Sequence, residues 1–300
     1  MAYLFSGTPI ALVARKATVM QRSLLRLGRI PAYADMVGRQ LSSRLRCLPN
    51  TIIVGAQKAG TSSLYGYLTQ HPDILGSNRK EVHYFDGGTD PRVDNFEKGE
   101  QWYRAHFPLK AKTSRRTRIL EATPSYLFVP HGPSRIAALV PNVKMIVVLR
   151  EPVERAISHY FYELHNGRED RPIMKALTEE EGLLEPIWRT RNYKSRELLQ
   201  YSYKARGRYA EQLARFFGYF ARDQLLILSS KSLFKTTTEA LSRTLDFLGL
   251  NSDVPIPDKS ARNVGTYNSP VEKDVIEYLE NYFAPYNDDL FELLGGKLDW

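Results

Sequence analysis

Cysteine and long apolar runs are almost missing from this chain of 300 residues. Cys47 is the only cysteine, so no intramolecular disulfide can form and nothing indicates an oxidising compartment. The longest apolar stretch near the start, Ile10 to Ala14, is far shorter than the ~18–20 residues that a helix needs to span a bilayer. These two absences predict a cytoplasmic protein without a transmembrane anchor.

Acidic residues are scarce at the start of the chain, where residues 1–49 contain only Asp35. The same segment contains eight basic residues: Arg15, Lys16, Arg22, Arg26, Arg29, Arg39, Arg44 and Arg46. This segment holds +7 of the formal net charge of +9, so the charge gives no support to nucleic-acid binding by the remainder. We expect a basic N-terminal arm, residues 1–49, followed by one domain, residues 50–300. A solvated helix, a transit peptide and a segment in peripheral contact with an anionic membrane all fit this arm.

Groups of His, Cys or closely spaced carboxylates with metal-ligand spacing are missing too, so the sequence predicts no metal site. The order Gly-x4-Gly-Lys-Ser/Thr of nucleoside triphosphate-binding P-loops is also absent, because Lys58 precedes Gly60 by two residues. Both absences count against a Mg²⁺-dependent nucleotide kinase, which stays open as an alternative.

The composition, 43% hydrophobic and 25% charged, is that of a soluble globular protein. Apolar runs predict strands at Thr51–Val54, Lys144–Leu149 and Leu225–Leu228. Helical spacing and capping residues predict helices after Thr61, from near Val153 to His165, from about Thr237 to Leu248, and from Ser269-Pro270 onward. The polar segments 86–118 and 165–195 are predicted to form surface loops or short helices. Strands separated by helices indicate a single α/β domain with a central parallel sheet flanked by helices.

The most informative segment is the P-loop-like sequence between the first strand and the first helix of the domain, which contains Gly55, Lys58 and Gly60. Backbone N–H groups and the positive end of the helix dipole converge on such a loop, and glycine lets the backbone approach an anion closely. Thr61, Ser62 or Ser63 can cap the first turn of the helix. The segment therefore predicts a phosphate or sulfate site to which Lys58 adds a full positive charge.

The order strand, Gly-x-x-Lys-x-Gly-Thr, helix resembles the 5′-phosphosulfate-binding loop of sulfotransferases that use 3′-phosphoadenosine 5′-phosphosulfate (PAPS). Other segments resemble the heparan sulfate sulfotransferase group and its bacterial relatives: Lys80–Asp86, Glu121–Tyr126, Leu149–Tyr160, Tyr282–Gly295 and Asp299-Trp300. The resemblance covers residues 50–300. It implies transfer of a sulfuryl group from PAPS to an acceptor hydroxyl or amine, with carbohydrate as the expected acceptor and PAP as the second product.

The same resemblance implies roles for individual residues. Lys58 would contact the bridging oxygen of the phosphosulfate, and Gln57, Ala59, Gly60, Thr61, Ser62 and Ser63 would complete the loop around the 5′-phosphate. Arg150 and Ser158 would bind the 3′-phosphate, although Arg150 could instead form a surface ion pair with Glu151 or Glu154. Arg262 would belong to a loop that closes on the nucleotide.

A general base must accept the acceptor's proton, and Glu81 is the residue that matches the family. His83 would share the face of Glu81 in an extended segment, and could assist, orient the acceptor or be the base itself. The alternatives without a catalytic role are a solvated charge pair between Lys80 and Glu81, and a packed, hydrogen-bonded histidine at His83. Consecutive aromatic residues at Tyr160, Phe161 and Tyr162 could stack on a ligand or simply divide between core and surface.

Some features depart from the resemblance. Ala122 occupies the position of a lysine in heparan 3-O-sulfotransferases, which removes one contact to an anionic glycan, and the lysine expected near Arg262 is not evident. The cysteine pair and membrane anchor of those Golgi enzymes are absent, which favours a soluble relative. Lipid, small-metabolite and protein tyrosine acceptors therefore stay open, as does a non-catalytic protein that binds PAP or sulfated glycans.

Overall fold

The computed structural model describes residues 29–262 and 270–300 and contains a sheet of five parallel strands. The strands are β1 (Thr51–Gly55), β2 (Ile74–Gly76), β3 (Arg118–Ala122), β4 (Lys144–Leu149) and β5 (Leu225–Ser229), in the spatial order β2-β3-β1-β4-β5. The prediction of one α/β domain with a central parallel sheet is confirmed.

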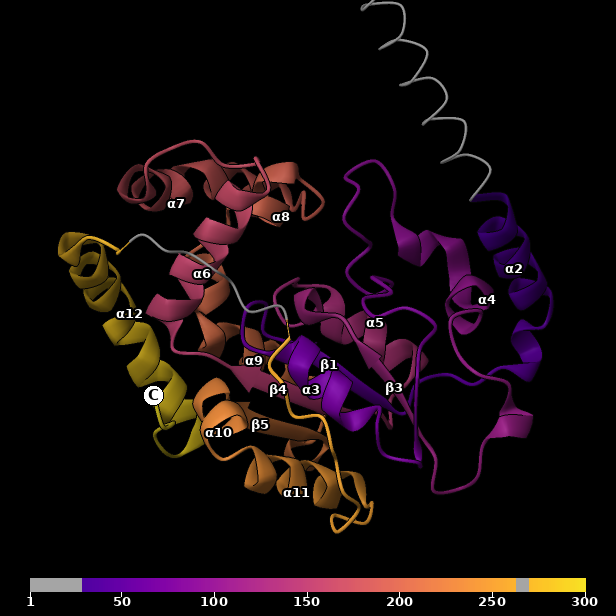
Figure 1. Cartoon of the computed structure of the whole chain (residues 1–300). Coiled ribbons are helices and arrows are strands. Elements are labelled where there is room, and N and C mark those ends of the chain that lie inside the picture. The colour runs from indigo at the N-terminus through magenta and orange to yellow at the C-terminus, as the bar shows by residue number, and fades with distance from the viewer. Residues whose placement is uncertain (1–28, 263–269) are drawn as a thin grey trace, which may run out of the picture.

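Helices cover both faces of this sheet (Figure 1). They are α2 (Arg29–Leu41), α3 (Thr61–Leu68), α4 (Gly99–Arg104), α5 (Gly132–Leu139), α6 (Pro152–His165), α7 (Ile173–Thr190), α8 (Arg196–Tyr201), α9 (Tyr209–Phe217), α10 (Ser230–Lys235), α11 (Thr237–Leu248) and α12 (Lys273–Leu294). Short 3₁₀ turns used below are η1 (Ser43–Leu45), η2 (Asn95–Lys98), η4 (Pro124–Tyr126) and η6 (Arg222–Gln224). Figure 1 shows α3 and α11 on one side of the sheet and α5 and α9 on the other.

The strand order reverses direction at β1. The chain leaves β1 toward β3 and β2 on one side, and then returns to β4 and β5 on the other. In an open parallel sheet, ligands bind beyond the carboxyl ends of the strands at such a reversal, because the two connecting loops diverge there and leave a crevice. The topology thus places the candidate site at the carboxyl ends of β1 and β4.

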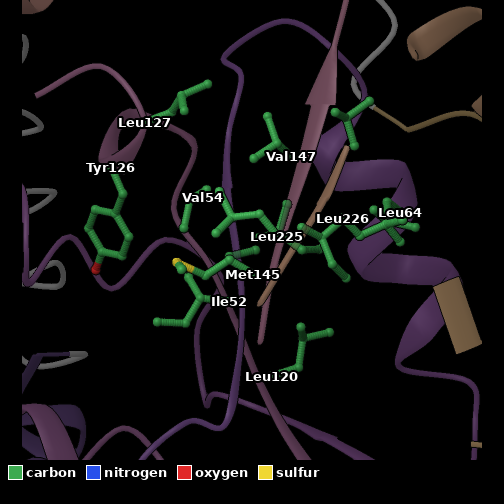
Figure 2. Close-up of a cluster of buried hydrophobic side chains, with 14 of the residues drawn as sticks. Ile52, Val54, Leu64, Leu120, Tyr126, Leu127, Met145, Val147, Leu225 and Leu226 are labelled. Atoms are coloured by element: carbon green, nitrogen blue, oxygen red, sulfur yellow. The ribbon is translucent and has the colours of Figure 1, made fainter. Parts of the chain in front are cut away.

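Apolar side chains of the strands form the centre of the core. Every residue of β1 is buried, as are the last five residues of β4. Figure 2 shows Leu64 of α3 beside Leu226 of β5, while Tyr126 and Leu127 lie beyond Val54 of β1. Burying one leucine contributes about 1.5–3 kcal/mol, so this core fixes the strand ends from which the functional loops start.

The strands predicted at Thr51, Lys144 and Leu225 are confirmed, but β2 and β3 were not predicted. The strand β2 has only three residues, and β3 contains the buried acid Glu121, which interrupts its apolar pattern. The expectation of loops or short helices in residues 165–195 was wrong for α7, an 18-residue helix. Its buried face includes Glu180, whose carboxylate accepts the N–H groups of Lys204 and Ala205 at 2.6 and 2.8 Å.

Two helix starts also differ from the predictions. The helix α12 begins at Lys273 with Glu272 as its N-cap, so Pro270 is not in the first turn, and Ser269 lies outside the described residues. The helix α3 has Gly60 as its N-cap, and no side chain at that position accepts a hydrogen bond from the first turn. A capping role for Thr61, Ser62 or Ser63 was therefore wrong, because these residues already belong to the helix.

Candidate active site

A cavity of about 1520 Å³ lies at the carboxyl ends of the strands. Of the predicted site residues, it is lined by Gln57, Lys58, Gly60, Thr61, Ser62, Glu81, His83, Arg150, Ser158 and Arg262. These residues come from four segments that are far apart in the sequence. The fold therefore brings together the residues that the sequence resemblance selected.

The loop after β1 leads into α3, whose N-terminus has no capping side chain. Gly60 has a φ of 101°, and a Cβ atom there would lie 2.9 Å from the ring of Phe234, so this position requires glycine. Without a capping side chain, the positive end of the α3 dipole is directed at the cavity, where it favours an anion. Gly55 has a different role from the one expected: a Cβ there would meet Leu127 at 2.5 Å, so Gly55 allows the packing of η4 against β1.

Lys58 extends over an aromatic ring inside the cavity. Its Nζ lies 4.4 Å from the ring centroid of Tyr162, and the guanidinium of Arg168 lies 5.3 Å from the same ring. Burial lowers the pKa of Lys58, and the positive charge of Arg150 lowers it further. A bound anion would relieve both effects, because it compensates lost hydration and repulsion between the cations.

Arg150 reaches the cavity from the β4–α6 connection, and Ser158 reaches it from α6. Arg150 Nε lies 3.0 Å from Glu154 Oε2, and Nη1 donates to the carbonyl of Lys58 at 3.3 Å. The expected ion pair with Glu154 is thus present in a residue that also lines the cavity. The α6 N-terminus is capped by Glu151, whose carboxylate accepts two backbone N–H groups. Because these N–H groups are already used, binding of an anion at this position depends on side chains.

The two remaining predicted residues support the loop from behind. Ala59 and Ser63 are fully buried and do not line the cavity. The Ser63 hydroxyl accepts the N–H of Arg262 at 2.8 Å, and Tyr67 donates to the carbonyl of Lys259 at 2.9 Å. These contacts fasten the segment that carries Arg262 onto α3, beside the loop that follows β1.

Glu81 and His83 form a carboxylate–imidazole pair in the segment between β2 and β3. His83 Nε2 lies 3.5 Å from Glu81 Oε2, and His83 Nδ1 lies 2.6 Å from Oδ2 of the buried Asp86. The Lys80 ammonium also contacts Glu81. Both Glu81 and His83 have left-handed backbones, with φ of 63° and 56°. The expected extended segment was wrong, and paired left-handed residues bring the two side chains together instead.

The charges of this cluster shift both pKa values. Burial opposes ionisation of Glu81, but the hydrogen bond with His83 and the Lys80 charge outweigh it and hold the pKa at about 2. Burial also opposes the imidazolium, but Asp86 and then Glu81 outweigh it and raise the pKa of His83 to about 9. At neutral pH the cluster therefore consists of two carboxylates that share one imidazolium.

A buried carboxylate in β3 supports the loop that carries this cluster. Glu121 accepts hydrogen bonds from the hydroxyls of Tyr103, Tyr126 (2.7 Å) and Thr123 (2.8 Å). Tyr126 Oη in turn accepts the N–H of Tyr84 at 2.9 Å. Glu121 thereby orients a hydroxyl that holds the backbone beside His83.

Replacing Glu121 by glutamine is expected to lower the free energy of unfolding by about 1–3 kcal/mol, because an amide N–H₂ would face hydroxyl donors in a buried site. Urea unfolding followed by fluorescence measures this change. Glu97→Gln, an exposed substitution in η2, should stay within about 0.5 kcal/mol of the wild type. Equal midpoints for Glu121→Gln and the wild type would contradict the role assigned to Glu121.

Sequence reasoning missed several residues that line the cavity: Asp86, Ser125, Lys231, Lys235 and Lys259. Lys231 and Lys235 belong to α10, directly after β5. Because parallel strands end at the same edge, the predicted strand at Leu225 could have indicated this position. Lys259 follows no strand or helix pattern, and no comparable signal points to it.

The three consecutive aromatic residues of α6 divide between core and cavity. Tyr160 is buried and donates to the carbonyl of Arg171 at 2.7 Å, so stacking on a ligand was wrong for this residue. Phe161 and Tyr162 line the cavity. Tyr209, Leu213 and Phe216 of α9 are fully buried and belong to the core.

The fold and the cavity together define an α/β protein in which a helix N-terminus without a capping side chain and a carboxylate–imidazole cluster line one cleft. The chain belongs to the sulfotransferase domain family, which it matches over residues 48–268. The resemblance found in the sequence is thereby confirmed.

Individual relatives agree with this family. The chain is 29% identical over 278 residues to mouse heparan sulfate glucosamine 3-O-sulfotransferase 3B1, covering 84% of this chain but only 65% of that protein. Human heparan sulfate glucosamine 3-O-sulfotransferase 6 is also 29% identical, with 85% and 74% covered. The crystal structure of a sulfotransferase from Alicyclobacillus acidocaldarius matches with a TM-score of 0.67 at 30% identity, covering 84% of this chain and 98% of that one.

Within residues 29–262 and 270–300, no group of three or more His, Cys, Asp or Glu side chains is arranged to hold a metal ion. In the same part of the chain, no helix is both long and apolar enough to cross a bilayer.

Proposed function

We propose that this protein transfers a sulfuryl group from PAPS to a hydroxyl or amine of a carbohydrate and releases PAP. The observation that carries this proposal is a single cavity in which Lys58, beside an uncapped helix N-terminus, shares the space with the Glu81–His83 pair. The names of the mammalian relatives support a glycan acceptor and a sulfuryl transfer reaction.

The donor half of the cavity would hold the phosphosulfate and stabilise the leaving phosphate. Gly60, Thr61 and Ser62 would surround the 5′-phosphate at the positive end of α3. As the bond between sulfur and the bridging oxygen breaks, that oxygen keeps the electron pair and gains negative charge. The Lys58 ammonium already lies in the cavity, so it can stabilise this charge with little reorganisation.

Arg150 and Ser158 would bind the 3′-phosphate, the group that distinguishes PAPS from ATP. A guanidinium can donate two parallel hydrogen bonds to a phosphate, and the hydroxyl adds a third donor. Lys231, Lys235, Lys259 and Arg262 raise the positive charge of the same cavity. Ligands with more phosphate or sulfate groups are therefore favoured electrostatically.

The acceptor half would remove the proton from the attacking group. An acceptor oxygen forms the new bond to sulfur while its proton passes to Glu81, whose carboxylate is ionised at neutral pH. His83 would remain protonated between Glu81 and Asp86 and orient the base through its position. The acceptor leaves as a sulfate ester or sulfamate, and PAP keeps the former bridging oxygen as part of its 5′-phosphate.

Changing Arg150 to alanine is expected to weaken PAP binding about 10- to 100-fold, because one or two charge-assisted hydrogen bonds are lost. Affinity for adenosine 5′-phosphosulfate, which has no 3′-phosphate, should not change. Titration calorimetry with PAP, ATP and adenosine 5′-phosphosulfate, without added metal, measures all three affinities.

The matched control is Arg222→Ala in η6, which precedes the amino end of β5 and does not line this cavity. Absence of PAP binding in the wild type, or ATP binding of equal strength, would contradict the proposal and favour the kinase alternative. Tight PAP binding without transfer to any acceptor would instead favour a non-catalytic binding protein.

A further inference from the structure

An unusually exposed apolar stripe runs along α2 and η1. It consists of Val37, Leu41 and Leu45, which follow one another at intervals of four residues and are 37%, 85% and 66% exposed. Ser42 donates its N–H to Gly38 and Leu45 donates its N–H to Ser42, so the backbone continues to turn between the two elements. Single exposed leucines are common, but a row of them on one edge indicates a contact surface.

The stripe is attached firmly to the domain. Arg39 Nε donates to the carbonyl of Ala105 at 2.6 Å, and Arg46 Nη1 donates to the carbonyl of Phe107 at 2.9 Å. Arg104 returns a hydrogen bond to the carbonyl of Arg46. Figure 1 shows α2 beside α4, at the edge of the fold away from α12. Polar side chains therefore hold α2 from its inner side and leave the apolar stripe outside.

Exposed positive charges lie on η1 and on the segment 110–116, which contacts η1, and form what we name the basic rim: Arg44, Lys110, Lys112, Arg115 and Arg116. Lys110 Nζ donates to the carbonyl of Arg44 at 3.1 Å, so this loop lies directly against η1. Neither residues 36–49 nor residues 101–120 contain an Asp or Glu. In sequence, residues 1–28 add four more basic residues and no acidic one.

We propose that the apolar stripe and the basic rim form a docking surface for a bilayer that contains anionic lipids. Leucines inserted at the level of the acyl chains lose their exposure to water, while arginine and lysine contact the headgroups. A nucleic acid or an acidic protein would match the charge, but it would leave the exposed leucines without an apolar environment. The combination of both features favours the lipid surface.

The test is co-sedimentation of the full chain with two kinds of extruded vesicles, phosphatidylcholine alone and phosphatidylcholine with 30% phosphatidylglycerol. The wild type should sediment with the anionic vesicles only, and 0.5 M NaCl should release most of it. The double substitution Leu41→Ser and Leu45→Ser should weaken partitioning at least about tenfold. Lys112→Glu with Arg116→Glu should do the same through charge.

The control variant is Tyr219→Ser, which removes an exposed aromatic residue elsewhere and should bind vesicles as the wild type does. Sulfuryl transfer to a soluble acceptor should be unchanged in all these variants, which shows that they fold. Equal sedimentation with neutral vesicles, or no effect of the leucine substitutions, would overturn the proposal. So would a leucine-dependent dimer in sedimentation velocity, because a second copy would then cover the stripe.

Discussion

Replacing Lys58 by alanine is expected to lower kcat for sulfuryl transfer about 10³-fold, while PAP affinity falls no more than about tenfold. In the proposed reaction Lys58 stabilises the charge that develops on the departing phosphate, and removing one preorganised donor of this kind typically costs about 10²–10³ in rate. The full charge of an ammonium places the expectation at the upper end. Initial rates with a sulfate-labelled donor, combined with calorimetry of PAP, separate the loss of catalysis from a loss of binding.

Two variants serve as controls for this result. Lys58→Arg keeps the charge and should recover part of the rate, whereas Lys112→Ala removes an exposed lysine outside the cavity and should change nothing. A near-normal kcat for Lys58→Ala would show that the leaving phosphate is stabilised by another group.

Replacing Glu81 by glutamine is expected to lower kcat about 10²- to 10⁴-fold with a much smaller change in KM, since the amide cannot accept the proton of the acceptor. Glu154→Gln is the matched control, because Glu154 lines the same cavity but pairs with Arg150. The pH profile of the wild type then separates the two candidates for the base.

If Glu81 is the base, the rate should be nearly constant from pH 5 to 8, because its pKa of about 2 leaves the carboxylate ionised throughout. If His83 is the base, the rate should rise about tenfold per pH unit toward pH 9, because only neutral imidazole accepts a proton and its pKa is raised to about 9. A flat profile together with full activity of Glu81→Gln would contradict both assignments.

The sequence was most informative where local chemistry and strand position agree. The loop around Lys58 follows a buried strand and precedes a helix, so its place at the sheet edge could be predicted from pattern alone. Arg150 follows a second such strand. Both residues line the cavity, as expected from the parallel sheet.

Other parts of the site depend on tertiary contacts that leave no periodic signal. Glu81 and His83 meet through left-handed backbones that are held by β3, whose own pattern is hidden by the buried Glu121. The position of Arg262 depends on hydrogen bonds to Ser63 across 199 residues of sequence. Single-sequence periodicity cannot report either arrangement, because both are set by contacts between distant segments.

The reversal of strand order at β1 also divides the two chemical tasks between separate parts of the chain. Groups assigned to the donor follow β1, β4 and β5, whereas Glu81 and His83 lie between β2 and β3 and are anchored by Glu81 N–H to the carbonyl of Ala122. Substitutions in the loop that follows β2 can therefore accumulate without disturbing the contacts proposed for the nucleotide. Such a division lets one scaffold acquire new acceptors during evolution, or by grafting of that loop, while the sulfuryl donor stays the same.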